Sequence, residues 1–132
     1  MKILSTKVHG ILDYMTGLLL IALPWIAGFN NVVDATWTVI FVGAMIIMMS
    51  LFTDYETGMI RSLPMSIHLN IDIVTGLLLA ASPWILGFAD QVYLPHLIFG
   101  LFETVASLVT TRQVRQHDDE KPVIRQNDLA NQ

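Results

Sequence analysis

Two pairs of histidine and aspartate recur in this chain at one spacing. His9 is followed by Asp13 and His68 by Asp72, so the partners in each pair lie four residues apart. On an α-helix this spacing places both side chains on one face, within reach of each other. Imidazoles and carboxylates bind protons and cations, so the four side chains form a candidate polar cluster or ion site.

The two pairs have more than one interpretation. Each pair can satisfy itself and pin helices together at the edge of a membrane. Alternatively, the four side chains form a shared hydrogen-bonded cluster that binds a proton or a cation. A set of two histidines and two aspartates could suit a divalent metal such as Zn²⁺, but the sequence shows no further residue that would anchor or orient the ion. From the sequence we therefore assign no metal and no cofactor.

A third ionisable group lies in an apolar stretch. Glu103 is near the middle of the segment 91–111, where the corresponding position of an earlier segment is Ile46. A charged side chain at that depth costs about 3 kcal/mol on insertion scales, which makes it a candidate functional site. His96 lies seven residues earlier on the same helix face. His96, Glu103 and the His-Asp pairs could relay protons, or Glu103 could be protonated, bonded to a neighbouring helix and purely structural.

Four apolar segments must position these groups. The chain has 132 residues, of which 54% are hydrophobic and 14% charged, and its mean hydropathy of +0.59 exceeds what a soluble domain of this size can bury. The segments cover roughly 8–27, 32–52, 65–86 and 91–111. Each has about the 20 residues needed to cross a ~30 Å hydrocarbon core, so we predict an all-α membrane protein with four transmembrane helices. The absence of cysteine excludes disulfides and thiolate metal sites.

Basic residues mark one side of the membrane. Neither the loop near residues 30–31 nor the loop near 89–90 contains Lys or Arg. Because cytoplasmic loops carry an excess of Lys and Arg, both termini and the middle loop are predicted to be cytoplasmic. The basic residues of the predicted cytoplasmic segments are Lys2, Lys7, Arg61, Arg112, Arg115, Lys121 and Arg125.

The second half of the chain repeats the first. At an offset of 59 residues, His9 aligns with His68 and Asp13 with Asp72. The repeat continues into the next segment, where a shorter second loop aligns Ser50-Leu51 with Ser107-Leu108, Thr53 with Thr110 and Gly43 with Gly100. The repeated unit is therefore a helical hairpin, and we predict two tandem hairpins that arose by internal duplication and pack as a four-helix bundle.

This repeat divides the chain into five parts. They are a cytoplasmic N-terminus at 1–7, a first hairpin at 8–52, a cytoplasmic loop at 53–64, a second hairpin at 65–111 and a polar cytoplasmic tail at 112–132.

A Pro-Trp motif occurs near the outer end of the first helix of each hairpin. Proline has no N–H, so Pro83 leaves the carbonyl of Leu79 without its helical partner, and the hydroxyl of Ser82 can donate to it. Tryptophan anchors at the membrane interface, and the following glycine permits the left-handed turn that ends a helix. We interpret the motif as structural. Its residues are Pro24, Trp25 and Gly28 in the first copy and Ser82, Pro83, Trp84 and Gly87 in the second.

Paired Pro-Trp segments in a two-hairpin membrane protein resemble the SPW-repeat family of small bacterial integral membrane proteins. The repeat of that family is two transmembrane helices with Ser-Pro-Trp in the first. Residues 82–84 match the motif fully, whereas Leu23 replaces the serine in the first copy. The resemblance covers about residues 5–111. It implies the fold and a multi-pass location in the bacterial inner (plasma) membrane, and it implies no catalytic residues.

These features predict a non-enzymatic membrane component with a structural, accessory or sensing role. The chain contains no G-x-S-x-G, phosphate-binding glycine loop, H-E-x-x-H or basic nucleic-acid patch, so neither an enzyme nor a nucleic-acid partner is expected. The expected partners are the lipid bilayer and either further copies of the chain or another membrane protein. The alternative is a proton- or cation-coupled channel or transporter that uses His9, Asp13, His68, Asp72, His96 and Glu103.

Overall fold

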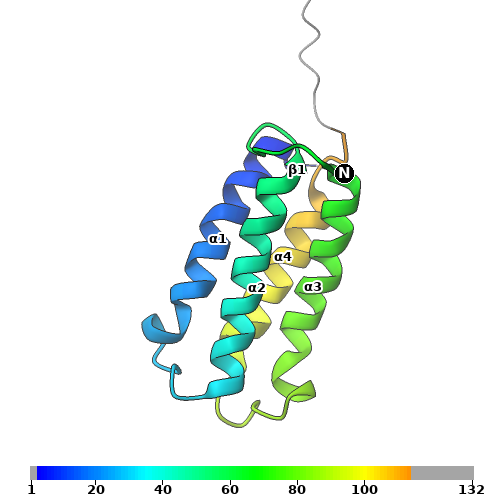
Figure 1. Cartoon of the computed structure of the whole chain (residues 1–132). Helices are drawn as coiled ribbons and strands as arrows, with labels where there is room; N and C mark the ends of the chain where they lie inside the picture. Colours follow the sequence, from blue (N-terminus) through cyan, green and yellow to red (C-terminus); the bar gives the residue numbers. More distant parts are fainter. Residues whose placement is uncertain (1–2, 114–132) are drawn as a thin grey trace, which may run out of the picture.

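The computed structural model describes residues 3–113, and this part of the chain is almost entirely helical. Its helices lie side by side (Figure 1). Most of the predicted tail at 112–132 falls outside the described residues. Within residues 3–113 the four helices are α1 (Thr6–Ile26), α2 (Val33–Phe52), α3 (Met65–Ile85) and α4 (Leu94–Val109).

Within residues 3–113, α1, α2 and α3 are long and apolar enough to cross a membrane by length and composition. The apolar helix α4 has 16 residues, or about 24 Å at 1.5 Å per residue. The prediction of a segment over 91–111 is therefore wrong at both ends. Pro95 fixes the first turn of α4, since proline suits the start of a helix. At the other end Thr110 is extended and bridges to Leu4 instead of continuing the helix.

Each motif proline lies inside its helix, close to the C-terminal end. The helices continue past Pro24 and Pro83 to end at Ile26 and Ile85. The hydroxyl of Ser82 donates to the carbonyl oxygen of Leu79 at 2.7 Å, as the sequence predicts. A hydroxyl therefore takes the place of the proline's missing N–H.

The motif glycines and tryptophans mark the end of each hairpin at which its two helices are connected. Gly28 and Gly87 have φ of 74° and 78°, the left-handed region in which glycine ends a helix without strain. Trp25 and Trp84 are largely exposed, and the Trp84 ring lies 5.7 Å from that of Tyr93. This end of the molecule therefore presents the aromatic side chains expected at a membrane interface.

The opposite end is tied by short parallel bridges that the sequence did not predict. β1 (Thr53–Asp54) pairs in parallel with β2 (Leu63–Pro64), and Leu4 forms a similar bridge with Thr110. Two-residue strands are too short to leave a periodic pattern in a sequence. The bridges connect the residues before one hairpin to the last residues of the other.

Glycines allow the two helices of each hairpin to approach at the backbone. A side-chain carbon added to Gly43 would lie 2.6 Å from the carbonyl oxygen of Gly17, and one added to Gly76 would lie 2.7 Å from that of Gly100. Only hydrogen fits at these positions. The same contact therefore joins α1 to α2 and α3 to α4.

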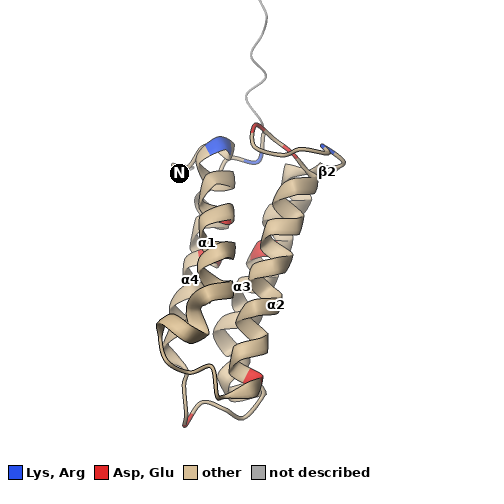
Figure 2. Ribbon diagram, turned by 60° about the vertical axis from the view of Figure 1, so that its left-hand side comes forward, with Lys and Arg blue, Asp and Glu red and all other residues tan. Residues whose placement is uncertain are grey.

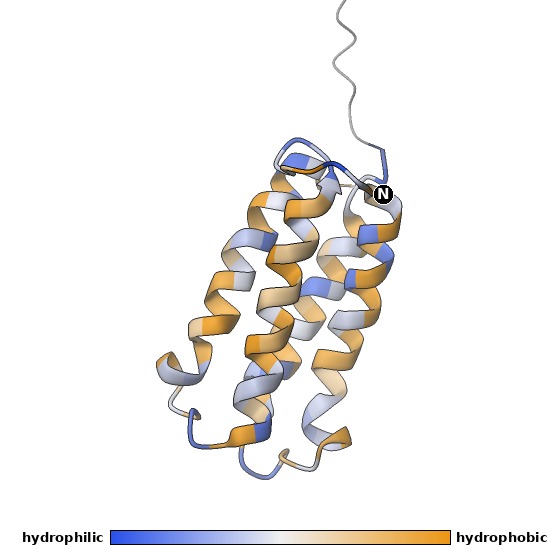
Figure 3. Cartoon of the chain, in the orientation of Figure 1, coloured by the Kyte–Doolittle hydropathy of each residue, from blue (hydrophilic) through white to orange (hydrophobic). Residues whose placement is uncertain are grey.

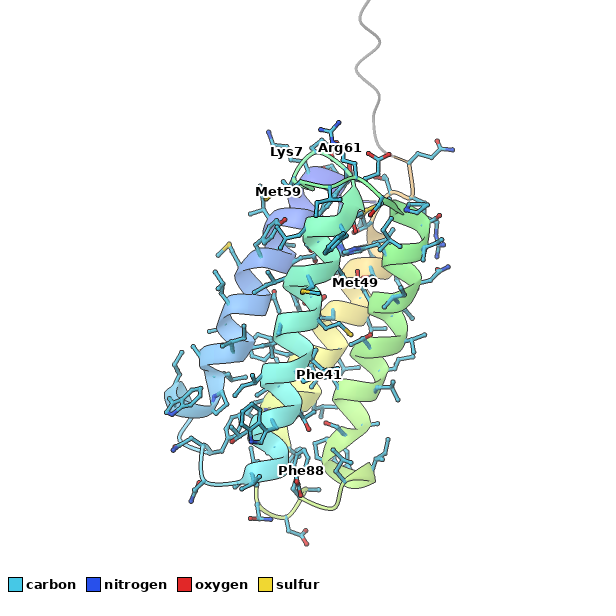
Figure 4. The ribbon with its side chains drawn as sticks, viewed as in Figure 1. Lys7, Phe41, Met49, Met59, Arg61 and Phe88 are labelled. Atoms are coloured by element: carbon cyan, nitrogen blue, oxygen red, sulfur yellow. The ribbon has the colours of Figure 1, made fainter. Side chains whose placement is uncertain are left out.

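The outer surface of the helices is apolar. Orange bands cover the helices and most blue segments gather at the two ends, with a few on the helices (Figure 3). Phe41 is 69% exposed and projects from the middle of α2 (Figure 4). The basic residues of the described part lie at one end, where the described part begins and ends at residues 3 and 113 (Figure 2). They include Lys7 and Arg61, which are labelled in Figure 4.

Candidate functional site

The two His-Asp pairs meet in one cluster between α1 and α3. His9 Nε2 lies 3.3 Å from Asp13 Oδ1 and 3.2 Å from Asp72 Oδ2. His68 Nε2 lies 3.1 Å from Asp13 Oδ2 and 2.9 Å from Asp72 Oδ2. All four side chains are at most 5% exposed. Each imidazole therefore contacts the aspartate of its own helix and the aspartate of the other hairpin.

The other nitrogen of each imidazole is held by a threonine of the opposite hairpin. His68 Nδ1 lies 2.7 Å from Thr53 Oγ1, and His9 Nδ1 lies 3.1 Å from Thr110 Oγ1. Each threonine hydroxyl donates its own proton to a helix carbonyl four residues earlier, at 2.7 Å and 2.6 Å. A hydroxyl whose proton is committed can only accept, so Nδ1 of each histidine carries the hydrogen.

Serines hold the carboxylates from within each hairpin. Ser50 on α2 donates to Asp13 Oδ2 at 2.8 Å, and Ser107 on α4 donates to Asp72 Oδ2 at 3.3 Å. These bonds fix the direction in which the carboxylate oxygens point. All the helices therefore contribute to the cluster, and equivalent residues of the two hairpins contribute in the same way.

The loop between α2 and α3 closes the cluster at the end of the molecule where residues 3 and 113 lie. Tyr55 is 1% exposed, and its ring lies 5.9 Å from that of His68. Burial raises the pKa of the Tyr55 phenol to about 12, so this ring is neutral over the physiological pH range. Further along the loop, Glu56 accepts from Thr6 at 2.6 Å, which fastens the loop to α1. The cluster is thus separated from water at this end.

His96 does not join the cluster and lies near the opposite end of the molecule. Its Nε2 donates to the carbonyl oxygen of Ala35 on α2 at 3.0 Å. The rings of Phe88 and Phe29 lie 4.9 Å and 5.6 Å from the imidazole. Within residues 3–113 its Nδ1 has no hydrogen-bond partner. His96 therefore links the two hairpins at the end of the molecule that carries the Pro-Trp motifs.

Glu103 occupies the interior between these two places. It is 3% exposed, and its Oε1 has no hydrogen-bond partner within the described part of the chain. It lies one helical turn from Ser107, which contacts Asp72, and two turns from His96. The equivalent Ile46 in the first hairpin is equally buried. Glu103 therefore breaks the equivalence of the two hairpins.

Sequence reasoning missed four residues of the cluster. Serine and threonine near the end of a helix carry no signal of their own, because such residues commonly bond to the backbone. The useful signal was the repeat, which keeps a serine and a threonine at corresponding positions of both hairpins. The missed residues are Ser50, Thr53, Ser107 and Thr110.

Residues 7–110 match the family described as the SPW repeat domain. The chain belongs to the SPW-repeat family. The SPW-repeat match includes both Pro-Trp motifs and every residue of the cluster, and it ends at Thr110. Comparisons with curated proteins and with solved structures return no significant match. Together with the apolar helices, SPW-repeat membership indicates a membrane protein.

Proposed function

We propose that this SPW-repeat protein is a non-enzymatic component of the bacterial inner membrane with a structural, accessory or sensing role. In this proposal the buried cluster clamps two duplicated hairpins into a four-helix bundle. The observation that carries it is that each imidazole bonds across the hairpins at both nitrogens, as at His68, which contacts Asp13 and Thr53. A merely local pair would not join the hairpins at this point.

Equivalent contacts support the duplication. The bond from Ser50 to Asp13 recurs between Ser107 and Asp72. The bridge from Leu63 to Thr53 recurs between Leu4 and Thr110, and the glycine contact of the first hairpin recurs in the second. A cluster built from two equivalent halves is what two copies of one hairpin would form about a common axis.

Burial explains why the clamp would be strong. The carboxylates of Asp13 and Asp72 are 2% and 5% exposed, and each is bonded to both imidazoles. Removing one member of a buried charged pair leaves the other uncompensated, at a cost of about 3–5 kcal/mol. Such a cluster favours one arrangement of the hairpins over all others.

A proton- or cation-coupled channel or transporter is the second candidate. It is favoured by Glu103 and His96, which are both buried on α4 and each have a side-chain atom without a hydrogen-bond partner within residues 3–113. Buried ionisable groups with spare hydrogen-bonding capacity are the parts of proton relays. The closed loop over His68 weighs against this role, because it separates the cluster from the water at that end.

Asp72→Asn and Glu103→Gln separate the two functions. The clamp predicts that Asp72→Asn lowers the free energy of unfolding in detergent by about 3 kcal/mol or more. It also predicts that wild-type proteoliposomes show no proton or cation flux above protein-free vesicles. Transport predicts flux in wild type that Glu103→Gln abolishes. An Asp72→Asn protein as stable as wild type would refute the clamp.

A further inference from the structure

We propose that His9, Asp13, His68 and Asp72 bind one divalent transition-metal ion, and that Zn²⁺ fits this ligand set best. The proposal goes beyond the clamp, because imidazoles and carboxylates can hold each other without an ion. It also assigns a metal ion to a cluster for which the sequence analysis assigned none.

The candidate ligand atoms already lie close together. One ligand atom from each of the four residues can be chosen so that all lie within 4.8 Å of one another. In a tetrahedral zinc site with bonds of 2.0–2.1 Å, the ligand atoms lie about 3.3 Å apart. The four N–O distances in the cluster run from 2.9 to 3.3 Å, with Asp13 using one oxygen for each histidine and Asp72 using Oδ2 for both. The widest separation would have to close from up to 4.8 Å towards about 3.3 Å, which side-chain rotation can supply.

The hydrogen bonds direct the imidazoles as a metal ion requires. Metal-bound histidine usually donates its second N–H to an oxygen, which fixes the ring and turns the other nitrogen towards the metal. Thr53 and Thr110 play this part for His68 and His9, since their hydroxyls accept from Nδ1. Both Nε2 atoms consequently face the centre of the cluster. Ser50 and Ser107 orient the carboxylate oxygens in the same way.

The geometry favours a shared central partner over separate pairs. Each Nε2 lies at nearly equal distances from two carboxylate oxygens, 3.3 and 3.2 Å for His9 and 3.1 and 2.9 Å for His68. One N–H cannot point directly at two acceptors, whereas a cation accepts ligands from several directions. A divalent ion would also neutralise the two buried carboxylates. Two imidazoles and two carboxylates suit Zn²⁺ and its neighbours better than Mg²⁺ or Ca²⁺, which prefer oxygen ligands.

Metal binding to the full-length protein in detergent micelles tests the proposal. The protein is purified without a histidine tag, stripped with a chelator and titrated with Zn²⁺ and with Co²⁺. His117, which lies outside the described residues, is changed to Asn in every sample, so that it supplies no ligand of its own. We expect one Zn²⁺ per chain by calorimetry and metal analysis, and a visible Co²⁺ absorption spectrum typical of tetrahedral nitrogen and oxygen coordination.

Three variants assign the ion to the cluster. His68→Asn is expected to abolish binding, whereas His96→Asn, which removes another buried histidine, is expected to keep it. Thr53→Val leaves all four ligands in place and should weaken binding about 10–100-fold. Protein that carries only the His117→Asn change and binds neither metal overturns the proposal, whatever the other variants show. Binding that survives in folded His68→Asn also overturns it. Neither result bears on the clamp, which is measured by unfolding in the absence of metal.

Discussion

At the scale of single residues, two threonines decide how the cluster is oriented. Thr53 and Thr110 each donate to a carbonyl of their own helix and accept from a histidine of the opposite hairpin. Each hydroxyl thus connects the end of its own helix to the imidazole of a histidine in the opposite hairpin. The direction of each imidazole follows from this arrangement.

Replacing Thr53 by valine should therefore destabilise the protein more than the loss of an ordinary helical hydroxyl. Valine keeps the shape but leaves Nδ1–H of His68 buried without an acceptor, which costs about 1–3 kcal/mol. Thr104→Val is the matched control, because the buried hydroxyl of Thr104 also donates to a carbonyl four residues earlier, at 2.9 Å from Gly100. Chemical unfolding of metal-free protein in detergent measures both. Equal losses for the two variants would contradict this role for Thr53.

The spacing of the histidines and aspartates predicted only part of this site. Four residues on a helix are enough to place His9 beside Asp13, because that contact is local. The contact between His9 and Asp72 depends on how α1 and α3 pack, which no local pattern encodes. Burial of the cluster beneath Tyr55 depends likewise on the path of a loop whose sequence has no helical or strand period.

At the scale of elements, close approach of the backbones holds each hairpin together. Gly17 faces Gly43 and Gly76 faces Gly100, with no room for a side chain between the helices. Lipid tails are as apolar as leucine, so helices gain little by hiding apolar side chains from them. Packing at short range must then supply the association that the hydrophobic effect supplies in water.

Gly43→Ala tests this packing, since two effects of opposite sign compete. Alanine is the better helix former by about 1 kcal/mol, but its methyl group would lie 2.6 Å from the Gly17 carbonyl oxygen. Overpacking typically costs about 1–3 kcal/mol, so we expect a net loss of stability. Ala44→Leu, at the neighbouring exposed position, should change little. Unfolding followed by circular dichroism compares them, and a more stable Gly43→Ala protein would show that the helices can separate without cost.

The sequence located most helix ends to within two residues. The ends of α1 and α3 could be predicted because a Pro-Trp motif and a glycine mark them chemically. The last helix was extended too far because the apolar segment begins at Val92, before the helix starts at Leu94, and runs to the helix end at Val109 without a signal that marks it. The helix starts where Pro95 fixes its first turn and ends where Thr110 bridges to Leu4. A hydropathy pattern contains neither signal.

At the scale of the whole molecule, the two ends differ in chemistry. Every Lys and Arg of the described part lies at the end where residues 3 and 113 lie, beside the acidic residues Asp54 and Glu56 (Figure 2). Trp25 and Trp84 lie at the other end, whose loops contain no Lys or Arg. By the excess of positive charge on cytoplasmic segments, the end with residues 3 and 113 should face the cytoplasm.

Because the chain has no cysteine, single introduced cysteines can test this orientation directly. A thiol reagent that cannot cross membranes should label Asn31→Cys in intact spheroplasts but label Met59→Cys only after permeabilisation. Met59 is 78% exposed, so a lack of reaction in intact spheroplasts would reflect its side of the membrane. Val74→Cys, on the outer face of α3, should react in neither case because lipid covers it. The reverse pattern for the first two would invert the proposed topology.

The parallel bridges also bear on how the order of the chain relates to the fold. Leu4 meets Thr110 just as Leu63 meets Thr53, so each hairpin is tethered by the residues that introduce the other. We therefore expect the fold to survive circular permutation. The permuted chain would start at Leu63, continue from Thr110 through a linker to Leu4, and end after Thr53. It would keep both bridges and all residues of the cluster. Cut into two separate hairpins, the protein would be a heterodimer in which each subunit brings half of the cluster, and neither half is complete without the other.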